Sequence, residues 1–94
     1  MSDILNRRLI PSADAAESPV GDETVILHLT KGSYYGLDAV GTRVWTLIKQ
    51  QVATPEICRR LAEEYEVGIE TIEADVRLFL GELEVHGIVV DAAD

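Results

Sequence analysis

The sequence predicts an α+β domain in which a three-stranded antiparallel sheet packs on three helices. Up to Leu37, apolar residues alternate with polar ones in segments separated by short turn signals, a pattern typical of strands. After Leu37, apolar residues recur with the period of a helix. A chain of 94 residues holds one hydrophobic core, so we expect the sheet and the helices to cover each other.

The beginning of the chain has no stable apolar period. Residues 1–13 mix charged and apolar residues with Pro11, so we expect a loose N-terminal arm here. We assign the folded domain to residues 14–90.

Three strands are expected before the helical pattern begins. The segment "DAAESPVGDETVILHL" carries a turn signal, Gly21-Asp22, between two extended segments. Pro19 must lie near a sheet edge or a strand end, because proline cannot donate to a sheet ladder. Lys31-Gly32 supplies the next turn, and "SYYGL" completes an antiparallel meander as its third strand.

The third strand is expected to be an open edge. Lys31 is the only nearby charge, and neither a proline nor an inward charge defends this edge. Tyr35 and Leu37 should face the helices, leaving Tyr34 on the opposite face. Simple core and rim packing would explain both tyrosines. An undefended edge also invites a partner strand, whose main chain would supply affinity while adjacent pockets select side chains.

The first two helices have recognisable start signals. Asp38 is the expected N-cap of a helix that ends near Gln50, with the apolar stripe Val40, Val44, Trp45, Leu47 and Ile48. Thr54 as N-cap, followed by Pro55 in the first turn, begins the second helix. Its expected buried face comprises Ile57, Cys58, Leu61, Ala62 and Tyr65.

A third helix is expected from near Glu70 to about His86, ended by Gly87, and residues 88–90 follow as an apolar tail suited to an extra strand or wing. Its core stripe comprises Ile72, Val76, Phe79, Leu80 and Leu83. Leu78 and Val85 point elsewhere, beyond a polar shoulder of Asp75, Glu82 and His86. Two scattered surface residues would explain this pattern, and so would the apolar wall of a groove with a polar rim.

Composition and motifs exclude most chemistry. Eight basic against 17 acidic residues leave a net charge of −9, which repels phosphate backbones, so we expect no nucleic-acid partner. Cys58 is alone, and His28 and His86 have no partners at metal-ligand spacing. No nucleophile, phosphate or dinucleotide motif occurs, so we expect neither catalysis nor a metal or cofactor. Without a membrane-spanning or signal segment, a cytoplasmic location is expected.

Together these segments resemble a known family. "ETVILHLTKGSYYGLDAVGTRVWTLI", "TPEICRRLAEEYEV" and "LEVHGIV" are similar to PqqD-like proteins over roughly residues 14–90. These are recognition elements for ribosomally made, post-translationally modified peptides, including members of pyrroloquinoline quinone and lasso-peptide pathways. The resemblance rests on an apolar strand, a G-x-Y-Y-x-L run and a Trp in the following helix, where Leu37 and Trp45 are expected to pack the corner.

The resemblance implies a function and a site. In this family the leader of a precursor peptide adds as a strand beside the third strand and the third helix. A modifying enzyme or a leader peptidase then receives the peptide. The matching positions are Ser33, Tyr34, Tyr35 and Gly36 on the strand and Asp75, Leu78, Phe79 and Glu82 on the helix.

Two other functions stay open at this point. A winged-helix DNA-binding regulator has similar topology, but "EADVRLFLGELE" sets one Arg against four acids where a recognition helix needs basic residues. A structural subunit of a larger enzyme would use the same groove for a fixed partner.

Overall fold

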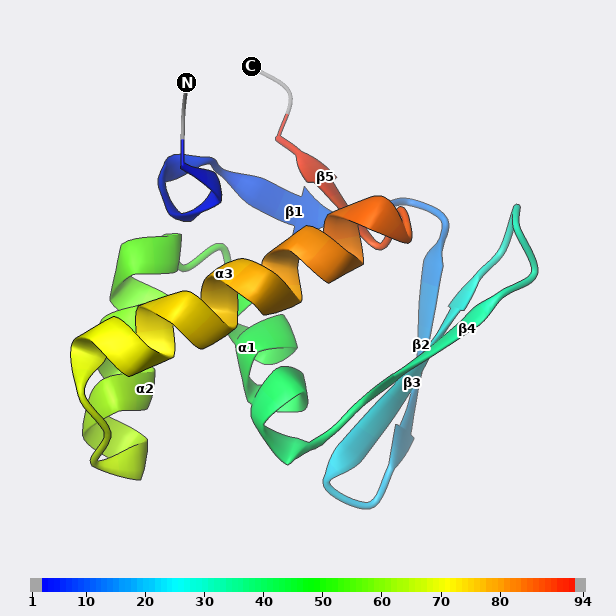
Figure 1. The fold of residues 1–94 in the computed structure, drawn as a ribbon. Helices are drawn as coiled ribbons and strands as arrows, with labels where there is room; N and C mark the ends of the chain where they lie inside the picture. The colour runs from blue at the N-terminus through cyan, green and yellow to red at the C-terminus, as the bar shows by residue number, and fades with distance from the viewer. Residues whose placement is uncertain (1–2, 93–94) are drawn as a thin grey trace.

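The computed structural model describes residues 3–92 and confirms the predicted α+β fold. Three antiparallel strands precede three helices, and short elements lie at both ends of the described chain (Figure 1). In chain order the elements are η1 (Ile4–Asn6), β1 (Leu9–Pro11), β2 (Ala15–Val20), β3 (Glu23–His28), β4 (Tyr34–Leu37), α1 (Ala39–Lys49), α2 (Thr54–Tyr65), α3 (Ile69–Val85) and β5 (Val89–Asp91).

The main sheet has the strand order β2-β3-β4, with both pairs antiparallel. Its inner face packs against the helices through alternate residues of β3 and β4, as the period of two requires. On β3 these are Thr24, Ile26 and His28, all buried; on β4, Leu37 is buried and Tyr35 is half-buried. Tyr34 lies on the other face with 73% of its side chain exposed, as the alternation predicted.

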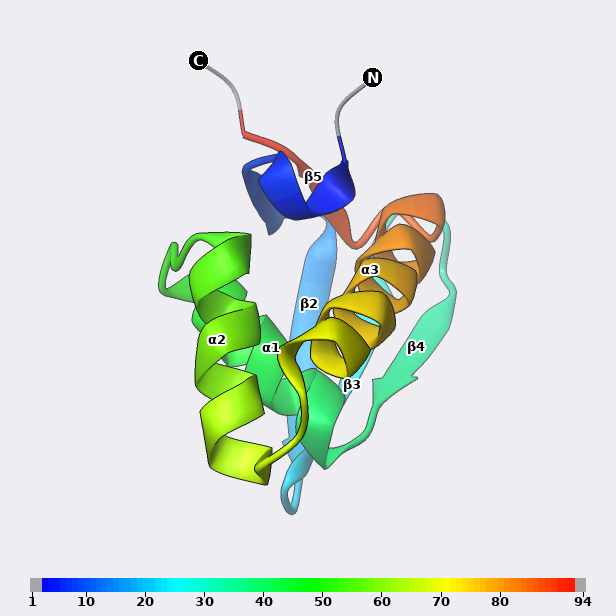
Figure 2. The ribbon, with the colours of Figure 1, turned by 60° about the vertical axis from the view of Figure 1, so that its left-hand side comes forward.

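The core lies between this sheet and the helices (Figure 2). Trp45 of α1 is only 2% exposed, and Leu37 is equally buried, so both residues belong to this core. The α3 stripe is buried at Ile72, Val76, Leu80 and Leu83, whereas Phe79 is only half-buried. No helix within residues 3–92 is long and apolar enough to cross a membrane.

The expected loose arm is wrong for residues 3–13. β1 pairs antiparallel with β5, and Leu5 and Leu9 are buried in the common core. Arg7 donates to the carboxylates of Glu84 and Asp91, which fastens the segment to the end of α3 and to β5. The sequence signal was misleading because β1 is only three residues long, and its partner strand lies near the other end of the chain.

Two details of the helices also differ from expectation. Thr54 is the first residue of α2 and is buried, while Ala53 occupies the N-cap without a side-chain bond. Val40 and Tyr65 are each 43% exposed, because the ends of α1 and α2 extend past the core. The Asp38 cap of α1 is as predicted, and its carboxylate accepts a hydrogen bond from the Gly41 amide at 2.8 Å.

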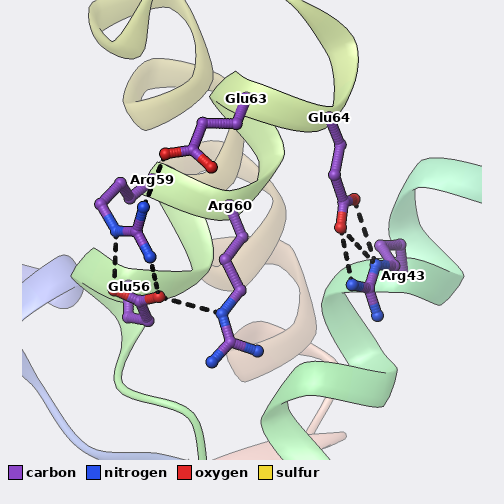
Figure 3. Close-up of polar contacts among 6 residues, drawn as sticks. All are labelled: Arg43, Glu56, Arg59, Arg60, Glu63 and Glu64. Carbon is purple, nitrogen blue, oxygen red and sulfur yellow. Dashed lines mark hydrogen bonds and ion pairs between the residues drawn. The ribbon is translucent and has the colours of Figure 1, made fainter.

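Most of the basic residues form ion pairs with carboxylates. On α2, Arg59 bridges Glu56 and Glu63, and Arg60 donates to Glu56, while Arg43 of α1 reaches across to Glu64 (Figure 3). The arginines hold the pKa of Glu56 down at about 2. Six of the eight basic residues of the chain lie in such pairs, namely Arg7, Arg43, Lys49, Arg59, Arg60 and Arg77.

Gly87, between α3 and β5, is expected to be intolerant of a side chain. Its φ is +73°, and a Cβ here would lie 3.0 Å from Nε2 of the buried His28. Gly87→Ala should lower the free energy of unfolding by about 1–3 kcal/mol, measured by urea denaturation. Gly32→Ala separates the two causes, because Gly32 has a φ of +70° but free space around its Cβ, and it should cost less.

Gly81→Ala is the matched control within α3. A Cβ at Gly81 meets nothing within 4 Å, so alanine should stabilise the helix by about 0.5–1 kcal/mol. Equal effects of the Gly87 and Gly32 substitutions would show that the contact with His28 is unimportant.

Candidate functional site

Half of the backbone polar groups of β4 point away from the sheet. The amide of His28 donates to the carbonyl of Ser33 at 2.8 Å, which fixes the phase of the β3–β4 ladder. Opposed residues of an antiparallel pair alternate between exchanging both hydrogen bonds and exchanging none. Ser33 and Tyr35 therefore direct their polar groups to β3. The N–H and C=O groups of Tyr34 and Gly36 face the open edge, and no other segment within residues 3–92 pairs with it.

The opposite edge of the sheet is defended. The same phase places Pro19 of β2 at an outward position, where its missing N–H removes a donor from that edge. Glu17, also outward, forms an ion pair with Lys49 of α1 at 2.7 Å. Proline and charge are the usual protections of an edge strand, so only the β4 edge remains available to a further strand.

Tyr35 connects β4 to the C-terminal half of α3, which lies beside it (Figure 2). Its hydroxyl donates to Glu82 Oε2 at 2.5 Å, and its ring lies 5.0 Å from the ring of His86 at an angle of 50°. Burial, the hydrogen bond to Glu82 and the nearby charges of Glu82 and Asp38 raise the pKa of Tyr35 to about 12. The neutral phenol thus joins the strand to the helix.

A hollow of about 320 Å³ lies between the start of α1 and the middle of α3. Phe79 forms part of its wall and packs closely on Gly41, where a Cβ would lie 3.2 Å from the ring. Asp38 and Asp75 also line it, among mainly aliphatic neighbours: Val40, Val44, Leu61, Ile72 and Val76. The hollow therefore combines an apolar wall with two carboxylates.

A second hollow, more open and of about 390 Å³, lies on the exposed face of α3. Leu78 and Val85 line it and are 70% and 77% exposed, as their position outside the core stripe predicted. Glu82 and His86 line the same hollow, and both also contact Tyr35. An apolar helix surface thus continues to the side of β4.

The eight predicted site residues divide into four pairs. Tyr34 and Gly36 carry the outward backbone groups, whereas Ser33 and Tyr35 use theirs within the sheet. Asp75 and Phe79 line the hollow beside α1, and Leu78 and Glu82 line the hollow on α3, with Tyr35 bonded to Glu82.

Sequence reasoning did not include three neighbours of these residues in the site. Asp38 was recognised only as a cap, and Val85 and His86 were considered as groove wall and polar rim but were not among the eight predicted site residues. The spacing of apolar residues along the third helix identified its exposed apolar face. It could not show that α1 forms one wall of the hollow beside Phe79.

Comparisons with known proteins give consistent matches. The model of a protein family described as Coenzyme PQQ synthesis protein D (PqqD) matches residues 23–89, more than two thirds of the chain. A solved structure described as TbiB1 in complex with the TbiA(beta) leader peptide is 38% identical, with a TM-score of 0.84, over 90% of this chain and 99% of that one. No curated protein matches the chain.

A second solved structure, a lasso peptide synthetase B1 complexed with the leader peptide, has a TM-score of 0.82 at 17% identity. The match covers 88% of this chain and 98% of that chain. At this identity the likeness supports the fold alone.

The contact between Tyr35 and Glu82 is expected to be visible in titrations. Because the pKa of Tyr35 is raised, the neutral phenol favours the folded state, and this stabilisation is complete below about pH 10 and lost as the pH rises towards 12. Glu82→Gln should lower the Tyr35 pKa towards its ordinary value of 10, measured by NMR of tyrosine labelled at Cζ, with Tyr35→Phe assigning the signal. An unchanged pKa in Glu82→Gln would contradict the hydrogen bond as a cause.

Proposed function

The chain belongs to the PqqD family, and from this premise we propose that it binds the leader segment of a ribosomally synthesised precursor peptide. The leader adds as a strand along the outward groups of Tyr34 and Gly36. Its side chains on the helix side contact the hollows lined by Asp75 and Phe79 and by Leu78 and Glu82. The observation that carries this proposal is an undefended sheet edge beside an exposed apolar helix face.

Strand addition suits a short edge of this kind. Two outward residues offer two N–H donors and two C=O acceptors, which hold any extended backbone without regard to its sequence. Residues of the leader opposite Tyr34 and Gly36 would point to the outer face of the sheet. Those opposite Tyr35 and Leu37 would point to the helix side, where α1 and α3 can select them.

The likeness to TbiB1 supports the same ligand class, because that relative is described in complex with a leader peptide. We assign this chain no catalytic step. Its role is to hold the leader and present the rest of the precursor to a modifying enzyme or a leader peptidase, in a lasso-peptide, pyrroloquinoline quinone or similar pathway. Tethering raises the concentration of the precursor near that enzyme.

The charge of α3 disfavours the DNA-binding alternative. Its only basic residue, Arg77, forms an ion pair with Asp3, while Glu70, Glu73, Asp75, Glu82 and Glu84 are acidic. A helix of this charge is repelled from phosphates. If the chain were instead a structural subunit of a larger enzyme, its fixed partner would occupy the same groove whether or not a leader peptide was present.

Amide hydrogen exchange tests strand addition directly. In the free protein the amides of Tyr34 and Gly36 should exchange quickly, while those of Tyr35 and Leu37 are protected by β3. Saturation with the TbiA(beta) leader peptide should slow exchange at Tyr34 and Gly36 by about tenfold or more and change the other two much less. Slowing of all four alike, or of none, would exclude addition at this edge.

Leu78→Glu should weaken binding of the same peptide by about 10- to 100-fold in isothermal titration, because it loses a buried apolar contact and places a charge in the groove. The fold should persist, since Leu78 is 70% exposed. Val20→Glu is the matched control, because Val20 is 59% exposed on β2, at the other edge of the sheet. Equal affinities of the two variants would remove Leu78 from the site.

A further inference from the structure

We propose that the hollow between α1 and α3 takes a lysine or arginine side chain of the bound peptide. Its hydrocarbon stem lies along Phe79 and Val76, and its charged end lies between the carboxylates of Asp38 and Asp75. This inference rests on the proposed function and specifies one property of the peptide that binds.

The position of the hollow fixes which residue of the peptide can enter it. Asp38 follows β4 directly, so the hollow lies at the Leu37 end of the open edge. Leu37 points to the helix side, and a neighbouring strand places its opposed residue on the same side. The peptide residue beside Leu37 is therefore the one aimed at this hollow, whereas the residue beside Tyr35 is aimed at Glu82 and the open surface of α3.

The walls of the hollow accept a hydrocarbon chain. Phe79 is half-buried, Val40 is 43% exposed, and deeper residues such as Val44 and Val76 are buried in the core. A volume of about 320 Å³ is enough for one long side chain. Lysine and arginine are suited to such a place, because they bury an aliphatic stem while keeping the charged group in water.

The charges select the cation over an equally long apolar residue. Asp38 and Asp75 are exposed carboxylates, and neither forms an ion pair within residues 3–92. The nearby Glu82 accepts only from the neutral Tyr35 hydroxyl. Six of the eight basic residues are already paired elsewhere, and no Lys or Arg of the described residues lines this hollow. A net charge of −9 adds to the local attraction for a basic peptide.

The test uses the TbiA(beta) leader peptide with each position replaced in turn by lysine or by norleucine, which has the same four-carbon stem without the charge. At one position, beside Leu37, lysine should bind about threefold to tenfold more tightly than norleucine at low salt. Near 1 M salt this preference should largely disappear, because a Debye length of about 3 Å screens exposed charges.

The protein variant for this test is Asp38→Asn/Asp75→Asn. Asparagine also caps helices, so α1 keeps its acceptor for the Gly41 amide. The double variant should lose the preference for lysine, so that the lysine and norleucine peptides bind with about equal affinity at that position. The control Asp22→Asn/Glu70→Gln changes the net charge equally at exposed sites away from the hollow, and it should retain the preference.

The outcomes separate the two proposals. If norleucine binds as tightly as lysine at every position, or if the preference survives in Asp38→Asn/Asp75→Asn, the carboxylates of Asp38 and Asp75 do not select a cation and this inference is wrong. If no peptide of the series binds and the amides of Tyr34 and Gly36 remain unprotected, the proposed function itself fails, and the inference fails with it.

Discussion

The backbone N–H and C=O groups on the edge of a sheet have no partner strand, and in the main sheet the β4 edge is the one that neither proline nor an ion pair protects. β4 pairs with β3 on one side and with no described segment on the other, and the chain passes from it directly into α1, whose first turn is capped by Asp38. The other edge of the sheet is protected by Pro19 and by the ion pair of Glu17 with Lys49. The unprotected edge of the sheet therefore lies beside the point where the chain turns from strand to helix.

The placement of α3 beside that edge depends on contacts at its end. β1 and β5 pair with each other, and Arg7 joins this pair to Glu84 near the C-terminus of α3. Gly87 allows a turn of positive φ that closes on His28 of the main sheet. Tyr35 then reaches from β4 to Glu82 and His86. The short terminal strands thus contribute to the groove although they do not line it.

The acidic residues of the domain differ in whether a basic residue neutralises them. Around α2 and at the ends of the chain, carboxylates are neutralised by arginines, as the network of Glu56, Arg59 and Arg60 illustrates. Along the groove, Asp38, Asp75 and Glu82 have no basic partner within the described residues. Exposed ion pairs contribute little to stability, so the main consequence of this distribution is electrostatic: the groove favours a cationic ligand.

The sequence by itself determined the order of strands and helices, the cap at Asp38, the outward position of Tyr34 and the two faces of α3, because all of these follow from local periodicity and turn chemistry. It also sufficed to recognise the family. Only the tertiary structure decided that residues 3–13 pack against β5, since that pairing joins opposite ends of the chain. The tertiary structure also decided the role of each residue of the candidate site. Which of Ser33, Tyr34, Tyr35 and Gly36 offers free backbone groups depends on the phase of pairing with β3, and the hollow beside Phe79 exists because α1 and α3, far apart in sequence, come together in the fold.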